Sequence, residues 1–332
     1  MPACTPAPDP DLIYLQDSPS LLQVEEAVSL LRAHGLTVVR TIAAADHARV
    51  AAVVVGLGTF AGADAERFPN LRTVAKFGAG SDGIDVDALW RDRRVLVSCT
   101  ADVATRDVAE WALALIVLAL RKAPRDIRRL GAESAAWRDI PRGISLSDAV
   151  VGIVGSGHIG TETARLLSGL AKKILFWNRS GVAVALPGTE TVADLADLAE
   201  RADVVSLHVA LGPSTRNLLG AAFFDRARKS GRTLALVNTA RGGVVDEAAL
   251  LQALEDGTVT AACIDVWSAE GTKETEIVRA LRRHPSVLPT SHIGAYTSGV
   301  QRRYAMRCAQ NIAAVIAGRP DEVESYIVRP AA

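Results

Sequence analysis

The sequence predicts an α/β fold built on two doubly wound parallel sheets, with helices on both faces of each sheet. Short apolar runs of β type alternate with helical patterns along nearly the whole chain, and such alternation favours parallel strands joined by helices. Most of these runs are continuously apolar, which is typical of strands covered on both faces. The chain has 332 residues, too many for one ordinary core, so we expect two domains.

The first predicted unit begins with a strand at Leu12–Leu15 and a helix near Ser20–His34, for which Gly35 is a good C-terminal stop. Four further apolar runs are expected to be its remaining strands: Thr37–Arg40, Ala51–Val55, Arg72–Ala75 and Val95–Val97. A long helix from about Thr105 to Leu130 then separates this unit from a second one. The uncharged part of that helix, residues 111–120, is shorter than the roughly 20 residues of a membrane span.

The second predicted unit opens with a strand at Ala149–Val154, a glycine-rich turn and a helix to about Leu170. Its further strands are expected at Ile174–Trp177, Val204–Leu207, Thr233–Val237 and Ala261–Val266. A last helix at about Ser298–Ala317 could pack back on the first unit, which would make that domain discontinuous.

Composition excludes several classes of function. Lysine plus arginine (37) balance aspartate plus glutamate (37), so neither nucleic acid nor an anionic membrane is a favoured partner. The N-terminal MPACTPAPDPD has neither a basic start nor an apolar core, which predicts a loose tail rather than a secretory signal. Cysteines stand at positions 4, 99, 263 and 308. No two are spaced as a metal or redox pair, so we expect no metal, and buried thiols suit the reducing cytoplasm.

The turn Gly155-Ser156-Gly157-His158-Ile159-Gly160 lies between the apolar run AVVGIV and the helical pattern HIGTETARLL. In that setting the glycines permit a tight turn and let a pyrophosphate approach the helix N-terminus. The turn therefore predicts a Rossmann-like dinucleotide site. A glycine turn selected only for tight packing of strand on helix is the alternative.

The residues after the next predicted strand refine the expected cofactor. A ribose-binding acid is expected about 20 residues past the turn, but Asn178 stands there, followed by Arg179 and Ser180. Asparagine does not repel a 2′-phosphate, and its two neighbours can donate to phosphate oxygens. This favours NADP(H). NAD(H) stays open, with Asn178 on a plain ribose and Arg179 as a solvated cation.

Three later segments end predicted strands at the edge where such sheets bind ligands. Arg241 follows one strand and can hold a carboxylate while polarising the adjacent carbonyl. Asp265 ends a second strand, and His292 follows the third; histidine is the natural acid and base for exchange between a carbonyl and an alcohol. Taken singly, Arg241 could be a structural ion-pair partner and His292 a loop histidine.

The motifs together identify a family. KFGAGSDGIDVDAL, ATRDVAEWALAL, GIVGSGHIG, ADVVSLHVALGPSTRNLLG, LVNTARGGVVDEAAL, IDVW and HPSVLPTSHIGAYT follow one another in this order. Their order and spacing resemble the D-isomer-specific 2-hydroxyacid dehydrogenases over nearly the whole chain. The resemblance implies a flavodoxin-like substrate domain (residues 1–102 plus 294–332) around an inserted NAD(P)-binding Rossmann domain (103–293). It also implies a homodimer.

The resemblance further implies a division of roles. Arg241 is expected to bind the substrate carboxylate with the backbone amides near Ala79 and Gly80, and His292 to exchange the proton. Hydride would move between the nicotinamide and the 2-carbon of a 2-oxo or 2-hydroxy acid. The implied cofactor site takes in the glycine turn, the Asn178–Ser180 segment and further residues from three strand ends: His208, Val209, Ala210, Thr239, Ala240, Asp265 and Gly294.

The pattern departs from the family after IDVW, where we expect the glutamate that orients the catalytic histidine and find Ser268. Serine can orient the ring by a hydrogen bond but supplies no charge, so Ser268 is predicted as a catalytic residue with Arg241 and His292. Without a carboxylate partner the histidine would titrate at lower pH, by about 1–3 pH units, unless Glu270 or Glu274 replaces it. Two readings follow. The chain is a dehydrogenase with a lowered pH optimum or an unusual substrate, or it is a dinucleotide-sensing, corepressor-like protein without activity.

Two cations could meet a second anionic group on the substrate. Lys76 begins the segment that resembles the family's substrate loop, and Arg106 lies at the start of the long helix. Either could bind a phosphate, phosphonate or distal carboxylate. Surface cations with solvated partners are the alternative for both.

Overall fold

The computed structural model describes residues 11–17, 19–132, 142–182, 184–270 and 273–323. The expected loose tail, apart from Asp11, and Cys4 within it lie outside the described residues. The chain forms two compact units: unit 1 is Met1–Ala104 with Thr297–Ala332, and unit 2 is Thr105–Tyr296. The boundaries expected from the sequence lie at 102/103 and 293/294.

Unit 1 contains a fully parallel sheet of five strands in the order β2-β1-β3-β4-β5, the flavodoxin-like order. Its strands are β1 (Asp11–Leu15), β2 (Leu36–Val39), β3 (Val50–Val55), β4 (Thr73–Lys76) and β5 (Leu96–Ser98). Its α-helices are α1 (Glu25–Ala33), α2 (Gly62–Ala65), α3 (Val86–Arg93) and α11 (Ser298–Ile316). Short 3₁₀ turns lie at Pro19–Gln23, Ala44–Arg49 and Pro320–Glu322.

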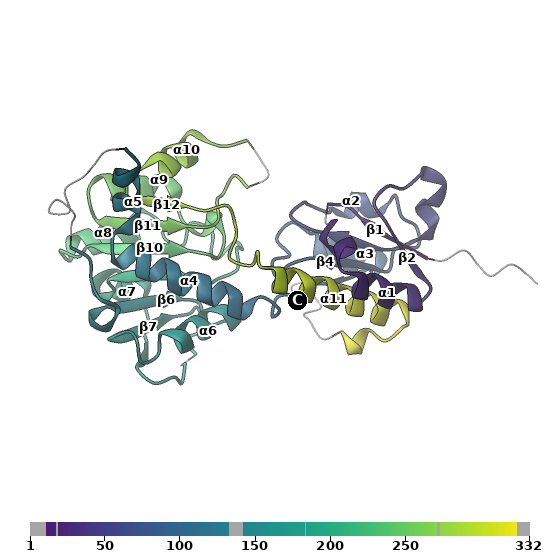
Figure 1. Cartoon of the computed structure of the whole chain (residues 1–332), viewed down its shortest axis with the longest axis horizontal. Helices are drawn as coiled ribbons and strands as arrows, with labels where there is room; N and C mark the ends of the chain where they lie inside the picture. Colours follow the sequence, from purple (N-terminus) through teal and green to yellow (C-terminus); the bar gives the residue numbers. More distant parts are fainter. Residues whose placement is uncertain (1–10, 18, 133–141, 183, 271–272, 324–332) are drawn as a thin grey trace, which may run out of the picture. The chain divides into compact units, whose positions relative to one another are not determined.

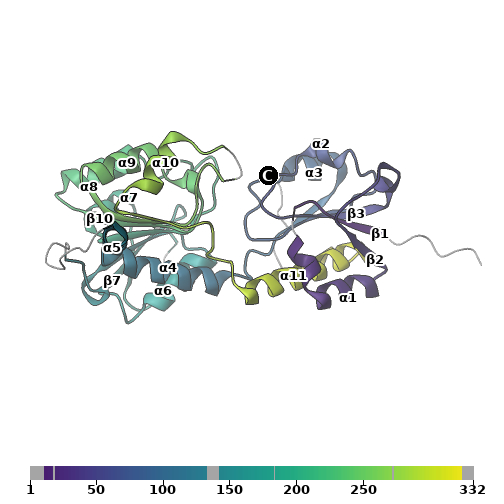
Figure 2. The same ribbon diagram turned by 45° about the horizontal axis from the view of Figure 1, so that its top comes forward.

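Two apolar cores cover the two faces of this sheet. On one face Leu31 of α1 and Ile312 of α11 pack with Ile13 of β1, and on the other face Leu89 of α3 packs with Val53 of β3. Figure 2 shows α1 and α11 on one side of the sheet and α2 and α3 on the other. The last helix of the chain therefore completes the core that the first hundred residues begin.

Unit 2 contains a parallel sheet of seven strands in the order β12-β11-β10-β9-β6-β7-β8. Its strands are β6 (Val150–Val154), β7 (Lys173–Trp177), β8 (Thr189–Thr191), β9 (Val204–Leu207), β10 (Leu234–Asn238), β11 (Val259–Ile264) and β12 (Val287–Pro289). Its α-helices are α4 (Thr105–Leu120), α5 (Ala123–Ala132), α6 (His158–Leu167), α7 (Leu195–Arg201), α8 (Ala221–Lys229), α9 (Glu247–Glu255) and α10 (Glu276–Arg283). The order is that of a doubly wound dinucleotide-binding sheet.

Helices also cover both faces of this second sheet (Figure 1). Leu115 of α4 and Leu167 of α6 pack with Ile153 of β6 on one face. Residues of α7, α8, α9 and α10 form the larger core on the other face. The predicted fold class, two α/β units with doubly wound parallel sheets, is confirmed.

Several predicted boundaries are wrong for physical reasons. The long helix is two helices, because Pro124 lacks an amide hydrogen and its ring would clash with the carbonyl four residues earlier; α4 ends at Leu120 and Lys122 takes a left-handed backbone (φ 55°). The first helix begins later than predicted, at Glu25, after a separate 3₁₀ turn. The short edge strands β8 and β12 carry too weak a pattern to be predicted.

Within the described residues no helix combines the length and the apolar character that crossing a bilayer demands. Helix α4 is apolar because it is packed in the unit 2 core. Its charged first turn is tied to α6 by an ion-pair network. Glu162 of α6 accepts hydrogen bonds from Arg106 of α4 (2.8 Å) and from Arg165 of its own helix (2.7 and 2.8 Å).

This network makes the stability of unit 2 depend on pH. Hydrogen bonds from Arg165 and Arg106, with their charges, outweigh burial and lower the pKa of Glu162 to about 2. Because the folded-state pKa lies below the ordinary value of 4.5, the stabilisation is complete above pH 4.5 and is lost as the pH falls through about 2.

We expect Glu162→Gln to lower the melting temperature at neutral pH, with the difference from wild type vanishing as the pH approaches 2. Thermal unfolding followed by circular dichroism across this pH range measures it. Asp225→Asn, which removes an exposed carboxylate beside Arg228 in the same unit, is the matched control. A difference that persists unchanged in acid would contradict the assignment.

Candidate active site

The glycine turn after β6 has two glycines that the fold itself requires. Gly155 has φ +104°, and a Cβ there would lie 2.4 Å from the His208 carbonyl oxygen. A Cβ on Gly160 would lie 2.0 Å from the Gly155 carbonyl oxygen. Gly157 differs, because φ is −71° and a Cβ would meet nothing within 4 Å. Gly157 caps α6, so this open space lies in front of a helix N-terminus, where backbone amides can receive a phosphate.

The residues around the turn fit a bound dinucleotide. His208 Nδ1 and Thr239 Oγ1, at the carboxyl ends of β9 and β10, are buried and have no hydrogen-bond partner among the described residues. Burial lowers the pKa of His208 to about 3, so the ring is neutral, with Nε2 held 2.9 Å from the Ser206 hydroxyl. Buried polar atoms without partners are uncommon and indicate a missing ligand or water.

The predicted cofactor residues lie at the carboxyl edge of the unit 2 sheet. Ser156, His158 and Ile159 form the turn and the first turn of α6. Val209 packs against Gly155, and the Ala210 carbonyl accepts a hydrogen bond from Thr215 (2.6 Å). These residues would hold the dinucleotide together with Asn178, Arg179, Ser180, His208, Thr239, Ala240 and Gly294.

Asn178 follows β7 directly, and its side-chain amide bonds residues 180 and 182 of the turn that begins here. Its Oδ1 accepts from the Ser180 hydroxyl (2.9 Å) and the Val182 amide (3.0 Å), and its Nδ2 donates to the Val182 carbonyl (2.8 Å). Arg179 and Ser180 are exposed beside it. The Arg179 guanidinium donates to the Ser214 hydroxyl from the loop after β9. The exposed donor group at this strand end is therefore the Arg179 guanidinium.

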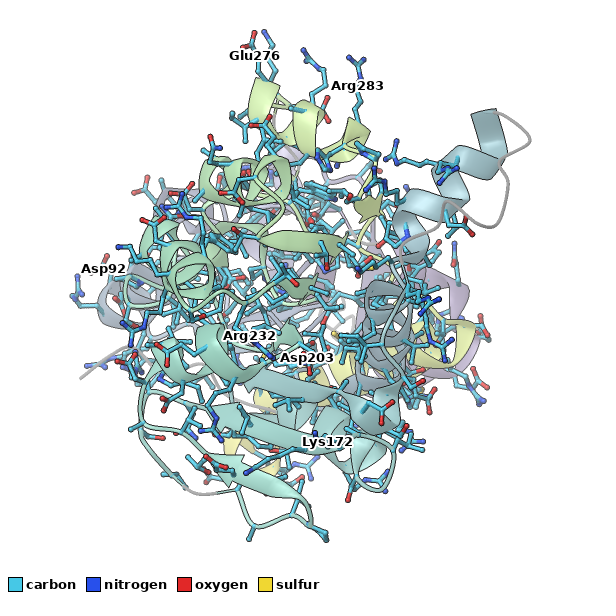
Figure 3. All side chains as sticks on the ribbon, turned by 90° about the vertical axis from the view of Figure 1, so that its left-hand side faces the viewer. Asp92, Lys172, Asp203, Arg232, Glu276 and Arg283 are labelled. Carbon is cyan, nitrogen blue, oxygen red and sulfur yellow. The ribbon has the colours of Figure 1, made fainter. Side chains whose placement is uncertain are left out.

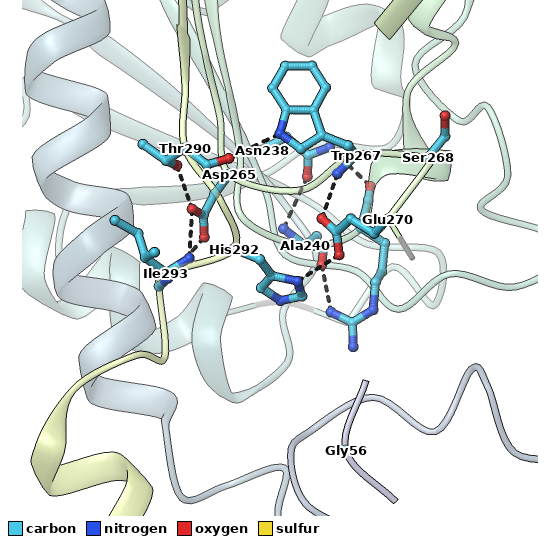
Figure 4. A network of polar contacts seen from close by, with 12 residues as sticks. Gly56, Asn238, Ala240, Asp265, Trp267, Ser268, Glu270, Thr290, His292 and Ile293 are labelled. Carbon is cyan, nitrogen blue, oxygen red and sulfur yellow. Dashed lines mark hydrogen bonds and ion pairs between the residues drawn. The ribbon is translucent and has the colours of Figure 1, made fainter. Parts of the chain in front are cut away.

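A second group of side chains is aligned by the register of three neighbouring strands. Asn238, the last residue of β10, pairs with Ile264 of β11, which pairs with Pro289 of β12. The three strands therefore end level with one another. The segments that follow them carry Arg241, Asp265 and His292. Figure 4 shows Asp265 and His292 on two of these segments.

Asn238 shapes the segment that presents Arg241. Its buried side chain accepts from the Ala240 amide and donates to the Arg241 carbonyl, both at 3.0 Å. The Arg241 guanidinium donates back to the Ala240 carbonyl at 2.7 Å. Asn238 was not among the predicted site residues, although a polar residue that ends a buried apolar strand signals such a role.

Asp265 organises the segment around His292. This carboxylate is 1% exposed and accepts from the Thr290 hydroxyl and from the amides of Ile293 and Gly294, both at 3.0 Å. The His292 amide donates to the Asp265 carbonyl at 2.8 Å. His292 has φ +58°, a left-handed conformation that is uncommon for histidine and that these bonds hold in place.

His292 has a carboxylate partner, although serine stands where the family glutamate was expected. Its Nδ1 lies 2.8 Å from Glu270 Oε2. Burial favours a raised pKa for Glu270, but the hydrogen bond and charge of His292, the Trp267 amide and the charge of Arg241 outweigh it, and the pKa lies below its ordinary value. Glu270 was one of the two replacements considered; the other, Glu274, bonds Arg279 and Arg282 instead.

Ser268, predicted as a catalytic residue, directs its hydrogen bonds to α9 rather than to His292. Its hydroxyl and amide both donate to the Glu247 carboxylate at the start of α9. The prediction failed because it placed the histidine's partner two residues too early in the loop. The sequence contains both serine and glutamate there, and only the path of the loop decides which one reaches the ring.

The constellation can perform acid-base chemistry next to an anion. Glu270 holds Nδ1 of the imidazole, which leaves Nε2 to exchange a proton with a bound substrate. Arg241 supplies a fork of donors suited to a carboxylate. The described residues contain no group of histidine, cysteine, aspartate or glutamate side chains arranged to hold a metal ion.

Unit 1 carries the other predicted substrate residues. Ala79 and Gly80 lie in the loop after β4, which Thr100 fixes by exchanging two 3.0 Å hydrogen bonds with Gly78. Lys76 is 8% exposed and its ammonium donates to the Gly56 carbonyl. The second predicted cation, Arg106 in unit 2, bonds Glu110 and Glu162.

Substitutions of Gly160 and Gly157 should have different effects, the first on stability and the second on dinucleotide binding. We expect Gly160→Ala to destabilise unit 2 by about 2–4 kcal/mol, because the added methyl overlaps backbone. We expect Gly157→Ala to leave the melting temperature unchanged and to weaken dinucleotide binding at least tenfold, by analogy with other close phosphate contacts. Thermal unfolding and fluorescence titration with NADPH measure the two effects. Tight binding by Gly157→Ala would contradict a pyrophosphate at this turn.

Comparison with known proteins identifies the family. The model for the NAD binding domain of the D-isomer specific 2-hydroxyacid dehydrogenases matches residues 113–294. A glyoxylate reductase from Thermofilum pendens is 34% identical over 256 residues, which cover 75% of this chain and 73% of the relative.

Solved structures share the fold. D-lactate dehydrogenase from Aquifex aeolicus, in complex with NAD and lactic acid, has a TM-score of 0.81 at 21% identity and covers 97% of this chain and 100% of that one. An NADPH-dependent glyoxylate/hydroxypyruvate reductase from Sinorhizobium meliloti, in complex with NADP and malonate, has a TM-score of 0.76 at 27% identity and covers 93% and 94%. The chain belongs to the D-isomer specific 2-hydroxyacid dehydrogenase family and is an NAD(P)-dependent D-2-hydroxyacid dehydrogenase.

Proposed function

We propose that this dehydrogenase interconverts small 2-oxo acids and D-2-hydroxy acids, with Arg241 binding the carboxylate and His292 exchanging the proton. The observation that carries the proposal is the His292–Glu270 pair, 2.8 Å apart, on a segment aligned with that of Arg241. Relatives named glyoxylate reductase and hydroxypyruvate reductase support small 2-oxo acids as the substrate class.

In the direction of reduction, the Arg241 guanidinium holds the substrate carboxylate through a fork of N–H donors and draws electron density from the neighbouring carbonyl. A nicotinamide bound in unit 2 would supply the hydride to the 2-carbon of the substrate. His292 donates a proton from Nε2 to the carbonyl oxygen, and Glu270 stabilises the protonated ring. In oxidation the neutral ring accepts the hydroxyl proton. The Ala79 and Gly80 amides of unit 1 are proposed as further carboxylate donors.

The existence of the His292–Glu270 pair removes the sequence-based reason for a non-catalytic sensor, which rested on a missing carboxylate. A second anionic group on the substrate remains a prediction. Lys76 and Arg106 already donate to other groups, so neither is a ready partner for it.

The expected cytoplasmic homodimer also remains a prediction. Val117 of α4 and Ile127 of α5 are 37% and 51% exposed and would line its interface.

Glu270→Gln tests the acid-base pair. We expect the upper pH limit of 2-oxo acid reduction to move to lower pH, because the ring loses the anion that favours its protonated form. The maximal rate should fall about tenfold to a hundredfold. NADPH oxidation with glyoxylate, followed across pH, measures both. Glu274→Gln, a carboxylate from the same connection that bonds two arginines, is the control. Superimposable pH profiles for Glu270→Gln and wild type would refute the pair.

We further propose that NADP(H) is the preferred cofactor, with the Arg179 guanidinium donating to the 2′-phosphate. Arg179 is exposed and oriented by Ser214, and Asn178 brings no negative charge to this strand end. We expect Arg179→Ala to raise the KM for NADPH at least tenfold and to leave that for NADH nearly unchanged. Arg226→Ala is the control, because it removes an arginine of α8 that pairs with Glu200 of α7. Equal effects on both cofactors would refute the phosphate contact.

A further inference from the structure

The segment that carries Glu270 is anchored by the first residue of α9. The Glu247 carboxylate accepts from the Ser268 amide at 3.0 Å and from the Ser268 hydroxyl. The cap of α9 does not need Glu247, because Asp246 already accepts from the amides of Ala248 and Ala249, both at 3.1 Å. Glu247 is thus directed to a loop that follows a different strand. We call this pair of bonds the Glu247–Ser268 clamp.

The clamped peptide also touches the segment of Arg241. A Cβ on Gly242 would lie 2.0 Å from the Trp267 carbonyl carbon and 2.1 Å from the Ser268 nitrogen. Only glycine permits this approach, and Gly242 directly follows Arg241. The Trp267–Ser268 peptide is therefore held between Gly242 and Glu247, which fixes its position relative to Arg241.

The same peptide leads to the acid-base pair (Figure 4). The Trp267 amide donates to Glu270 Oε1 at 2.7 Å, while Oε2 of that carboxylate faces His292. The Trp267 indole donates to the Thr290 carbonyl at 3.0 Å, two residues before His292. Arg282 lies 4.8 Å over the Trp267 ring. The Trp267 amide belongs to the neighbouring peptide bond, so a shift of the Trp267–Ser268 peptide would disturb the hydrogen bond that orients Glu270.

We propose that Glu247 and Ser268 are positioning residues, which hold Glu270 in hydrogen-bonding reach of His292 and in fixed relation to Arg241. This inference rests on the proposed function of Arg241 and His292. It also explains why serine suits position 268, where a glutamate side chain would face the Glu247 carboxylate. If the clamp is only a surface hydrogen bond, its loss changes stability and leaves the hydrogen bond between Glu270 and His292 as it was.

Glu247→Ala tests the clamp, with Glu276→Ala as the matched control. Glu276 is also the first residue of its helix, after the Thr275 cap, but it is exposed and projects away from the fold (Figure 3). We expect Glu247→Ala to lower kcat for glyoxylate reduction roughly tenfold with a smaller change in KM, as for other residues that orient a catalytic group. Glu276→Ala should retain the wild-type kcat. Equal kcat values in wild type and Glu247→Ala would overturn the proposal.

The hydrogen bond between His292 and Glu270 can also be followed by NMR, in a measurement that needs no turnover and is assigned with His292→Gln. Glu247→Ala retains Glu270, which bonds the ring, and Arg241, whose charge acts on Glu270. We expect the Nδ1 proton signal of His292 to move in this variant in the same direction as in Glu270→Gln but less far. An unmoved signal overturns the proposal, even if wild type proves inactive on every 2-oxo acid and the proposed function fails by itself.

Substitutions at position 268 give a charge-specific test. We expect Ser268→Thr, which keeps the hydroxyl, to retain activity, and Ser268→Glu to lose most of it through repulsion from Glu247. Adding Glu247→Gln to Ser268→Glu should restore part of the lost kcat, because an amide can hydrogen-bond a carboxylate. A double variant no better than Ser268→Glu alone would contradict the clamp.

Discussion

The register of β10, β11 and β12 is the constraint on which the candidate active site depends. Asn238, Ile264 and Pro289 lie side by side in the parallel ladder, so three segments that are far apart in sequence emerge at one edge of the sheet. Buried polar side chains then direct each segment, with Asn238 bonding the backbone before Arg241 and Asp265 the backbone after His292. A slip of one residue in either ladder would turn these side chains to the opposite face.

The dinucleotide site lies at the same carboxyl edge of the unit 2 sheet, but it depends on close backbone contacts made by glycines. Gly155 and Gly160 allow β6, α6 and the segment after β9 to meet closely, whereas Gly157 leaves space free in front of the helix. Neutral His208 and buried Thr239 place polar atoms without partners beside it. Packing and ligand binding thus use different glycines of one motif.

The fold could be predicted from the sequence because its apolar runs are long and its turns carry glycine at the required positions. Gly35, for example, ends α1 with φ +73°. The break after Leu120 was missed although Pro124 signals it, because the apolar pattern continues up to that point. Strands β8 and β12 were missed because three-residue edge strands bury too little apolar surface to leave a pattern.

The site could be predicted only as far as its residues lie directly at strand ends. Arg241, Asp265 and His292 do, and the structure aligns their segments. Glu270 and Glu247 do not, because their contacts depend on the path of the loop after Trp267 and on the packing of Gly242 beneath it. Position along the chain suggested Ser268 as the partner of His292, and the tertiary fold selected Glu270.

The variant His292→Gln tests whether His292 exchanges the proton. Reduction of glyoxylate by NADPH, measured under single-turnover conditions, should slow by about 10²–10⁴-fold in this variant, while NADPH binding followed by fluorescence stays within a factor of about three, since the substitution changes the acid and leaves the glycine turn intact. A single-turnover rate close to that of wild type would contradict the account.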